Sequence, residues 1–361
     1  MMNKKIVEVC LSPDLGGLEL CVVDFFEDFS KKSETYICVA PQSKLDNYVK
    51  NEKKFLLVRK KLFPFVAARK LAKFIDKNKI DLIHFHWTRD ITMVVLAKIL
   101  STQKPKIVQS RHMNMTRFKN DFYHKFLYKN IDLIHAVTEQ VKEQITRFIS
   151  SSIRPKVIVS YLGVNGVESQ SEMLLKLKEK HQLSSEFIVG IIGRIEEAKG
   201  QYLLIEAMQN LQNLNIKALI IGDTMNGEYL QQLKEKVREY GLENRIVFTG
   251  FTKDINGYMQ LCDVTVLATK KETFGLVVIE SMVNKTPVIA TKSGGPLEII
   301  DDGVDGLFFN GKSGDLAEKI EDIYEDSELK NRLCENGYKK VLHKFNKSVQ
   351  MKELYGVLNA S

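Results

Sequence analysis

Short runs of valine, isoleucine and leucine alternate with longer amphipathic segments along the chain of 361 residues. Near-continuous apolar runs of this kind are typical of strands that are buried on both faces of a parallel sheet, with helices in the connections. The alternation therefore predicts an α/β protein. Twelve runs are expected to be strands, six in each half of the chain: 5–12, 35–41, 81–87, 106–112, 132–138 and 157–163, then 187–194, 216–223, 246–251, 264–270, 287–291 and 306–309.

The two series of strands indicate two domains. A chain of this length can form two domains that each bury a core of their own. The polar, helix-favouring stretch 168–185 separates the series, so we predict a first domain over 1–167 and a second over 168–345, both doubly wound and Rossmann-like. Ligands of such sheets bind outside the carboxyl ends of the strands, and two such domains facing a shared cleft suit a nucleotide or a nucleotide sugar.

Positive charge is concentrated in the first half of the chain. Residues 1–165 hold 29 lysines and arginines against 16 acidic residues, whereas the remainder is net acidic. The segment 50–79 holds 11 of these basic residues. It predicts a helix after Pro64 with an apolar face (Phe65, Val66, Ala68, Leu71, Ala72 and Ile75) and a basic face (Arg69, Lys70, Lys73 and Lys77).

Two interpretations of this basic face are open. One is an ordinary solvated surface helix. The other is a face that settles on anionic lipid headgroups, where each basic residue contributes roughly 1 kcal/mol. No zinc-finger, RNA-binding or helix-turn-helix pattern accompanies the charge, so we expect no nucleic-acid partner. Five cysteines without CxxC spacing indicate reduced thiols, and no charge-free stretch is long enough to span a bilayer. We therefore expect a cytoplasmic protein, peripheral on the inner face of the cytoplasmic membrane.

A pair of glycines, Gly16 and Gly17, follows the first strand and precedes a helix that begins near Leu18. Glycine lets backbone approach a ligand closely, and a helix N-terminus offers free N–H groups. The turn matches neither GxGxxG nor a P-loop, so neither a dinucleotide fingerprint nor a Walker NTPase is supported. Alternatively, the two glycines serve only the geometry of the turn between the strand and the helix.

Two cations and two carboxylates follow strands of the second domain. Gly193 ends a strand, and Arg194 and Lys199 lie in the loop before the next helix, where both can clamp a diphosphate. Glu272 lies in a later loop of this kind, and Glu280 lies on the helix that follows. These carboxylates can accept hydrogen bonds from sugar hydroxyls and from a ribose, respectively.

The helix that carries Glu280 is expected to begin near Phe274. The backbone N–H groups of Phe274, Gly275 and Leu276 would then be helix-start donors for a phosphate. Thr273, directly before them, belongs to the same expected donor-binding loop.

Histidines end strands of the first domain. His86, close to His84 in DLIHFHWTRD, is either a core histidine or part of an acceptor site, since strand ends face the ligand. Asp121, in NDFYHKF, is a second acceptor candidate. A His-x-His zinc site needs further ligands, and no residue has suitable spacing, so we expect no metal site.

Together these motifs resemble the retaining glycosyltransferases of glycosyltransferase family 4, which have the GT-B fold. The family often has Asn-Gly-Val where this chain has Leu162-Gly163-Val164, which affects the domain junction. The likeness spans nearly the whole chain and lies in GRIEEAKG, in the two glutamates of ETFGLVVIE, in SGGPLEII, in the glycine pair of the first turn, in His112 at the end of IVQSRH, and in VTEQVKEQI.

The resemblance implies two Rossmann-like domains that face a central cleft, the first for the acceptor and the second for a nucleotide-sugar donor. A terminal helix at about 346–361 would pack back onto the first domain. Arg194 and Lys199 would hold the donor diphosphate, Glu280 the ribose and Glu272 the transferred sugar, with His112 near that sugar.

The implied activity is sugar transfer from a nucleotide sugar to a hydroxyl, with retention of configuration. No Asp-x-Asp is present to hold a metal, so side-chain cations and backbone donors would take its place. No cofactor is expected, because the nucleotide sugar, for which UDP is favoured, is a substrate. The basic first half predicts a membrane-anchored glycan or glycolipid acceptor of a bacterial envelope, such as lipopolysaccharide. The alternatives are a GT-B sugar-nucleotide epimerase and a non-catalytic nucleotide-sugar or glycan-binding protein.

Overall fold

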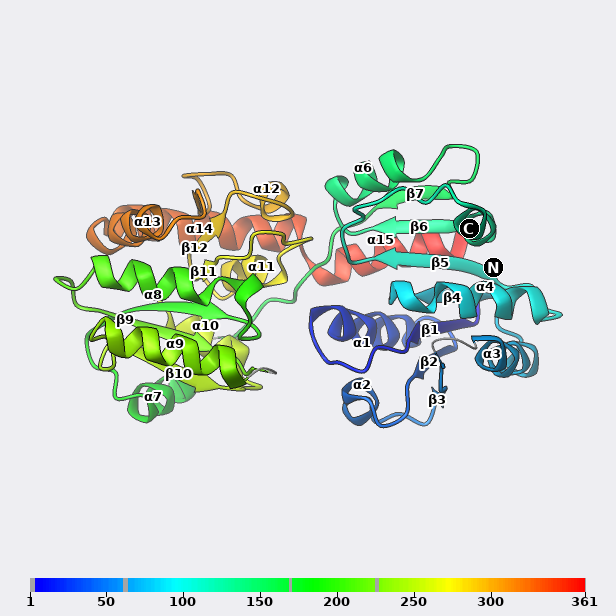
Figure 1. Ribbon diagram of the computed structural model, residues 1–361, viewed down its shortest axis with the longest axis horizontal. Helices are drawn as coiled ribbons and strands as arrows, with labels where there is room; N and C mark the ends of the chain where they lie inside the picture. The colour runs from blue at the N-terminus through cyan, green and yellow to red at the C-terminus, as the bar shows by residue number, and fades with distance from the viewer. Residues whose placement is uncertain (1–3, 61–63, 169–170, 225–226, 361) are drawn as a thin grey trace. The chain divides into compact units, whose positions relative to one another are not determined.

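The structure, a computed structural model, describes residues 4–60, 64–168, 171–224 and 227–360. The chain forms two compact units. Unit 1 comprises the residues up to Tyr161 together with those from Val349 onward, and unit 2 is Leu162–Ser348. Each unit contains one parallel sheet flanked by helices (Figure 1).

Unit 1 has a seven-stranded sheet of order β3-β2-β1-β4-β5-β6-β7. Beside β1 the chain order reverses, because β2 lies on one side of it and β4 on the other; ligands of such sheets bind at this switch point. The strands are β1 (Ile6–Cys10), β2 (Thr35–Val39), β3 (Lys54–Leu56), β4 (Leu82–Phe85), β5 (Lys106–Arg111), β6 (Leu133–Ala136) and β7 (Lys156–Val159). The helices are α1 (Gly17–Ser30), α2 (Lys44–Tyr48), α3 (Pro64–Asn78), α4 (Ile91–Leu100), α5 (Phe122–Lys129), α6 (Glu139–Phe148) and α15 (Lys347–Ala360).

Aromatic rings join α1 and α15 to the sheet of unit 1. Phe29 of α1 lies 5.4 Å from the ring of Tyr355 on α15 and 6.3 Å from the ring of His84 on β4. Tyr355 also reaches Ser33, with 2.9 Å between the two hydroxyl oxygens. The last helix of the chain is thus built into the core of unit 1, while α3 and α4 pack against each other (Figure 1).

All twelve expected strands are present, each shorter than expected, and β3 is an additional strand that was not predicted. This edge strand has only three residues, and its short apolar run, 55–58, lies between basic residues of the lysine-rich segment. Contacts of its side chains secure it: Lys54 Nζ lies 2.6 Å from Asp46 Oδ1, and the ring of Phe55 stacks on that of Phe74 at 4.3 Å.

The predicted helix after Pro64 is α3, but its apolar face was partly wrong. Ala67, which was not expected there, is buried together with Ala68, Leu71, Ala72 and Ile75. Phe65 is 54% exposed and Val66 is 62% exposed, because the first turn of the helix turns these two side chains away from the buried stripe. The basic residues of α3 are exposed, as expected.

Unit 2 has a six-stranded sheet of order β10-β9-β8-β11-β12-β13. Its strands are β8 (Phe187–Ile192), β9 (Ile216–Ile221), β10 (Ile246–Gly250), β11 (Val264–Leu267), β12 (Val288–Thr291) and β13 (Leu307–Phe309). Its helices are α7 (Ser171–Lys180), α8 (Gln201–Asn210), α9 (Gly227–Glu239), α10 (Ile255–Leu261), α11 (Leu276–Val283), α12 (Pro296–Ile299), α13 (Ser313–Glu325) and α14 (Ser327–Lys344). The adjacent strands β8 and β11 are followed by the two loops that carry the expected donor-site residues.

Candidate functional site

Two glycines shape the carboxyl edge of the unit 2 sheet. Gly193 follows β8 with a φ of 147°, and a Cβ atom built on it would meet nothing within 4 Å. Gly222 follows β9, and a Cβ atom there would lie 2.0 Å from the carbonyl oxygen of Gly193. The second glycine lets the two strand ends meet, and the first leaves open space at its backbone for a ligand to approach.

Arg194 lies directly after Gly193 and is held through its backbone. The amide Nε2 of Gln201 donates a 2.9 Å hydrogen bond to the carbonyl oxygen of Arg194. Gln201, which was not among the predicted site residues, is buried at the first position of α8. The side chain of Arg194 is 41% exposed, and its Nη1 lies 3.9 Å from Glu196 Oε2, so the guanidinium is only weakly paired.

Lys199 and Glu272, predicted separately for a phosphate and a sugar, form an ion pair. Lys199 Nζ lies 3.3 Å from Glu272 Oε2, and the two side chains are 31% and 21% exposed. A half-exposed pair of this kind contributes at most about 1 kcal/mol. A diphosphate, which carries more charge than one carboxylate, can therefore compete for the lysine.

The segment SGG packs against the loop that carries Glu272. The N–H of Gly295 donates to the carbonyl oxygen of Glu272 at 3.0 Å. A Cβ atom at Gly294 would lie 2.1 Å from that same oxygen, and one at Gly295 would lie 2.3 Å from the carbonyl oxygen of Phe274. These two glycines are required where they stand, because the two loops touch through their backbones.

Helix α11 begins later than expected, at Leu276, with Gly275 as its N-cap at a φ of 99°. Phe274 is instead buried ahead of the helix, with its ring 6.1 Å from that of Phe345. The expected helix-start donors Phe274 and Gly275 thus precede the helix, and Leu276 is its first residue. Thr273 donates its N–H to Glu272 Oε1 at 3.2 Å, and Glu280 lies one turn after Leu276 on α11, partly exposed.

The glycine turn of unit 1 differs in one respect from the prediction. The helix start was expected to offer free N–H groups, but the N–H of Gly16 donates to Glu19 Oε2 at 2.9 Å and so caps α1 internally. Gly17 is the first residue of α1. Beside the turn, Asp90 accepts the N–H of Leu11 at 2.9 Å; burial raises the pKa of Asp90 to about 6.

A buried carboxylate, Glu8, joins the histidines at the strand ends of unit 1. His84 Nδ1 lies 3.1 Å from Glu8 Oε1, and His86 Nε2 lies 2.6 Å from Glu8 Oε2. His86 Nδ1 lies 3.2 Å from Nε2 of the half-buried His112. The structure thus brings His86 and His112 together. Glu8 was missed, although a single carboxylate within the apolar run IVEVC was a usable signal.

Burial sets the charge of this cluster. Desolvation raises the pKa of Glu8, lowers that of His86 well below its usual value and lowers that of His112 to about 3. Glu8, His84 and His86 also offer ligand atoms within 4.8 Å of one another, the donor types of a metal site. The 2.6 Å between His86 Nε2 and Glu8 Oε2 is a hydrogen-bond distance.

Asp121 has a structural role at the start of α5. It caps the helix, since its Oδ1 accepts the N–H of His124 at 3.1 Å, and it also pairs with the His124 ring. The hydrogen bonds from His124 lower the pKa of Asp121. Among the contacts of the described residues, none joins Asp121 to His86, the other acceptor candidate.

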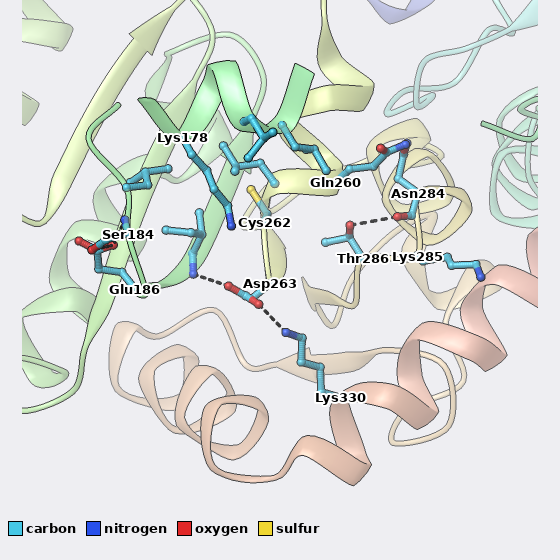
Figure 2. A pocket seen from close by; sticks show the side chains of 15 residues that line it. Lys178, Ser184, Glu186, Gln260, Cys262, Asp263, Asn284, Lys285, Thr286 and Lys330 are labelled. Atoms are coloured by element: carbon cyan, nitrogen blue, oxygen red, sulfur yellow. Dashed lines mark hydrogen bonds and ion pairs between the residues drawn. The ribbon is translucent and has the colours of Figure 1, made fainter. Parts of the chain in front are cut away.

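A cavity of about 560 Å³ lies at the opposite, amino-terminal edge of the unit 2 sheet (Figure 2). Ile188 near the start of β8, Asp263 before β11 and Thr286 before β12 line it. Its polar groups bond to one another: Asp263 accepts the N–H of Ile188 at 2.7 Å and pairs with Lys330. The donor-site residues therefore lie at the other edge of the sheet from this cavity.

Two family models match the chain in succession. Residues 15–165 match the model of Glycosyltransferase Family 4, and residues 175–340 match that of Glycosyl transferases group 1. The first match covers most of unit 1, and the second lies within unit 2.

Similar proteins include named glycosyltransferases of other organisms. An uncharacterised glycosyltransferase of Methanocaldococcus jannaschii is 27% identical over 90% of this chain and 89% of its own. The lipopolysaccharide core biosynthesis glycosyltransferase LpsE of Rhizobium meliloti is 32% identical over 61% of this chain and 62% of its own. The crystal structure of Anabaena HepE in complex with UDP-glucose matches with a TM-score of 0.87 at 21% identity, covering 99% of this chain and 100% of the other. The chain thus belongs to the glycosyltransferases of the GT-B fold, with a family 4 domain followed by a group 1 domain.

Proposed function

We propose that this glycosyltransferase moves a sugar from a UDP-sugar to a hydroxyl of a membrane-anchored envelope glycan, with retention of configuration and without a metal ion. One observation carries the proposal: Lys199 and Glu272 form an exchangeable ion pair at the carboxyl edge of the unit 2 sheet, and Arg194 begins the loop that carries Lys199. HepE, which shares the fold, was crystallised with UDP-glucose, and LpsE acts in lipopolysaccharide core biosynthesis. Those names supply the nucleotide and the class of acceptor.

The proposed chemistry follows from where charge develops. The bond between the anomeric carbon and the diphosphate oxygen breaks, and the leaving diphosphate gains negative charge. Arg194, Lys199 and the N–H of Leu276 at the start of α11 stabilise that charge. The acceptor hydroxyl attacks from the same face, and its proton passes to the leaving phosphate. Glu272, released from Lys199, accepts hydrogen bonds from the transferred sugar, and Glu280 accepts them from the ribose.

Nucleotide sugars test the donor assignment directly. In a panel of UDP-, GDP- and ADP-sugars, a UDP-sugar is expected to raise the melting temperature most, since a ligand at 100 times its Kd adds roughly 2.7 kcal/mol of stability.

Glu280→Gln is expected to weaken UDP binding while changing kcat little, because a ribose contact is equal in ground and transition states. A chelator is expected to leave transfer intact. Unchanged UDP affinity of the Glu280 variant would remove its ribose role, and an absolute Mn²⁺ or Mg²⁺ requirement would remove the metal-free mechanism.

Exposed apolar and basic residues of α3 support docking to an anionic bilayer. Phe65 and Val66 stand exposed at the first turn, next to the exposed Arg69, Lys70 and Lys73. This combination favours anionic lipid, because apolar side chains enter the headgroup region while the cations meet its charge. Two other basic residues of the segment are used internally: Lys54 pairs with Asp46, and Arg59 pairs with the buried Asp90 at 3.0 Å. Lys61 lies outside the described residues.

A second aromatic group adds to this surface. Phe118, Phe122 and Phe126, on α5 and the loop before it, are exposed, and Phe122 is 88% exposed. Helix α5 packs against α4, as α3 does, so both exposed groups flank one helix. No helix among the described residues is both long and apolar enough to cross a bilayer.

Vesicle binding tests the docking surface. The protein is expected to co-sediment with anionic vesicles at low salt and to dissociate as salt rises, because the Debye length falls to about 8 Å at physiological ionic strength. Arg69→Glu with Lys70→Glu is expected to abolish most of the binding. The matched control is Lys234→Glu with Arg238→Glu on the exposed face of α9, which makes the same change in net charge. An equal loss of vesicle binding in both double variants, or no binding to anionic vesicles at low salt, would show that α3 is an ordinary solvated surface helix.

A further inference from the structure

Unit 1 contains a continuous chain of buried hydrogen bonds across four strands. In the parallel register Glu8 of β1 lies beside His84 of β4, and Ser110 of β5 lies beside His135 of β6, so their side chains share one face of the sheet. His84 Nε2 lies 2.7 Å from Ser110 Oγ, and Ser110 Oγ lies 2.6 Å from His135 Nδ1. His135 Nε2 lies 2.7 Å from the carbonyl oxygen of Ser160.

The carbonyl of Ser160 fixes the direction of this chain, because a carbonyl oxygen only accepts. His135 therefore carries its proton on Nε2, and burial lowers the pKa of His135 to about 4, so its Nδ1 is an acceptor at neutral pH. Ser110 donates its one hydroxyl proton to that nitrogen. The oxygen of Ser110 must then accept from His84, which therefore carries a proton on Nε2.

Glu8 and the Nδ1 atom of His84 share one further proton. His84 Nδ1 lies 3.1 Å from Glu8 Oε1 and 3.0 Å from Glu8 Oε2, and lone pairs cannot face each other at such distances, so the proton lies either on the imidazole or on the carboxyl. In both cases Glu8 Oε2 keeps a lone pair toward His86. A proton on Oε2 as well would leave an uncompensated positive charge on His84 in the core, which is the costly arrangement.

We propose that the chain from Ser160 to Glu8 sets the tautomer of His112, so that its Nδ1 is a fixed hydrogen-bond acceptor. His86 donates from Nε2 to Glu8 and keeps Nδ1 as an acceptor, which in turn requires His112 to donate from Nε2 across the 3.2 Å contact. The ring of Phe25 stacks on that of His86 at 5.4 Å and holds its orientation. The other nitrogen of the half-buried His112 then presents a lone pair.

The assigned lone pair determines what His112 can bind. Resting on the proposed function, the neutral ring accepts a hydrogen bond from a hydroxyl of the sugar or of the acceptor, and it does not donate a proton. Glu8, His84 and His86 are positioning residues that act through His112. A ring with the opposite tautomer would present an N–H to the same hydroxyl, which would then have to turn its proton elsewhere.

The tautomer is measured by long-range ¹H–¹⁵N correlation spectra of the full chain labelled at histidine. The wild type is expected to show His112 neutral and protonated at Nε2 between pH 6 and 8. His86→Leu is expected to give a mixture of both tautomers and to lower kcat on the order of a hundredfold, the cost of a misdirected catalytic contact. Spectra that show His112 protonated at Nδ1 in the wild type, or no change of tautomer in His86→Leu, would overturn the proposal.

Two substitutions at Glu8 test whether its hydrogen bonds, and not its volume, set the tautomer of His112. In Glu8→Gln the amide can donate to His84 Nδ1 and its oxygen can accept from His86, so the wild-type tautomer of His112 is expected to persist. Glu8→Leu, of similar volume, removes both contacts and is expected to mix the tautomers. A stoichiometric metal ion on Glu8, His84 and His86, detected by elemental analysis, would also overturn the proposal, since the metal would replace the shared proton. If no sugar transfer is found, the spectra still decide the tautomer.

Discussion

Replacing Lys199 by alanine is expected to lower turnover by about a hundredfold or more, the cost of losing one preorganised charge at a developing anion. Lys199 Nζ lies 3.3 Å from Glu272 Oε2, on the loop before α8 that is bounded by Gly193 and Gly200. Arg194→Ala is expected to have an effect of the same size, because Gln201 fixes the backbone from which the guanidinium reaches out. Neither change is expected to lower the melting temperature by more than about a degree or two, since half-exposed pairs contribute little to stability.

A lysine with the same exposure provides the control for this prediction. The side chain of Lys319 on α13 is also 31% exposed, and its Nζ lies 2.9 Å from Asp322 Oδ2. Lys319→Ala therefore removes a comparable ion pair from the same unit and is expected to leave turnover unchanged. Steady-state rates of the three variants with a UDP-sugar make the comparison. Near-wild-type turnover in both Lys199→Ala and Arg194→Ala would show that the diphosphate is held elsewhere.

Gly295→Ala is expected to have the second large effect. The added methyl group would lie 2.3 Å from the carbonyl oxygen and 2.4 Å from the Cα atom of Phe274, so backbone has to move. Overpacking of this kind costs roughly 1–3 kcal/mol. The movement falls on the loop that carries Glu272 and leads into α11, and a misplacement of about 1 Å at a catalytic group costs on the order of a hundredfold in rate.

Gly314→Ala is the matched control, because a Cβ atom at Gly314 meets nothing within 4 Å and alanine favours the helix α13 in which it stands. Thermal unfolding and the Kd for UDP measure both variants. Gly295→Ala is expected to melt lower and to bind UDP more weakly, while Gly314→Ala matches the wild type or exceeds its stability. A Gly295 variant with unchanged UDP affinity would mean that the contact between the two loops does not position the donor site.

The strand pattern could be predicted from the sequence because buried parallel strands are continuous apolar runs, and all twelve runs are strands. The edge strand β3 was missed because its short apolar run lies within the basic segment and only three of its residues pair in the sheet. Phe65 and Val66 were misplaced because hydrophobic periodicity cannot tell a buried first turn from one that faces outward.

The donor-site residues of unit 2 could be named from motif spacing, but their pairing could not. That Lys199 meets Glu272 depends on β8 and β11 being neighbours, which is a property of the sheet order. Gly16 was assigned to a ligand because glycine lets backbone approach closely and a helix start offers free N–H groups, whereas Glu19, three residues later, accepts the N–H of Gly16. Glu8 was overlooked because a buried strand is recognised from its apolar residues, and the single carboxylate within that run was not considered separately.

The position of α15 has a consequence for synthesis on the ribosome. Unit 1 takes its last helix from the end of the chain, so all of unit 2 is translated before unit 1 can close. Gln350 of α15 accepts a 3.2 Å hydrogen bond from the hydroxyl of Ser160, the residue whose carbonyl anchors the histidine chain. Until that helix docks, Ser160 lacks this hydrogen bond and Phe29 lacks the ring of Tyr355 that packs on it. Loss of α15 would therefore damage the unit that was made first.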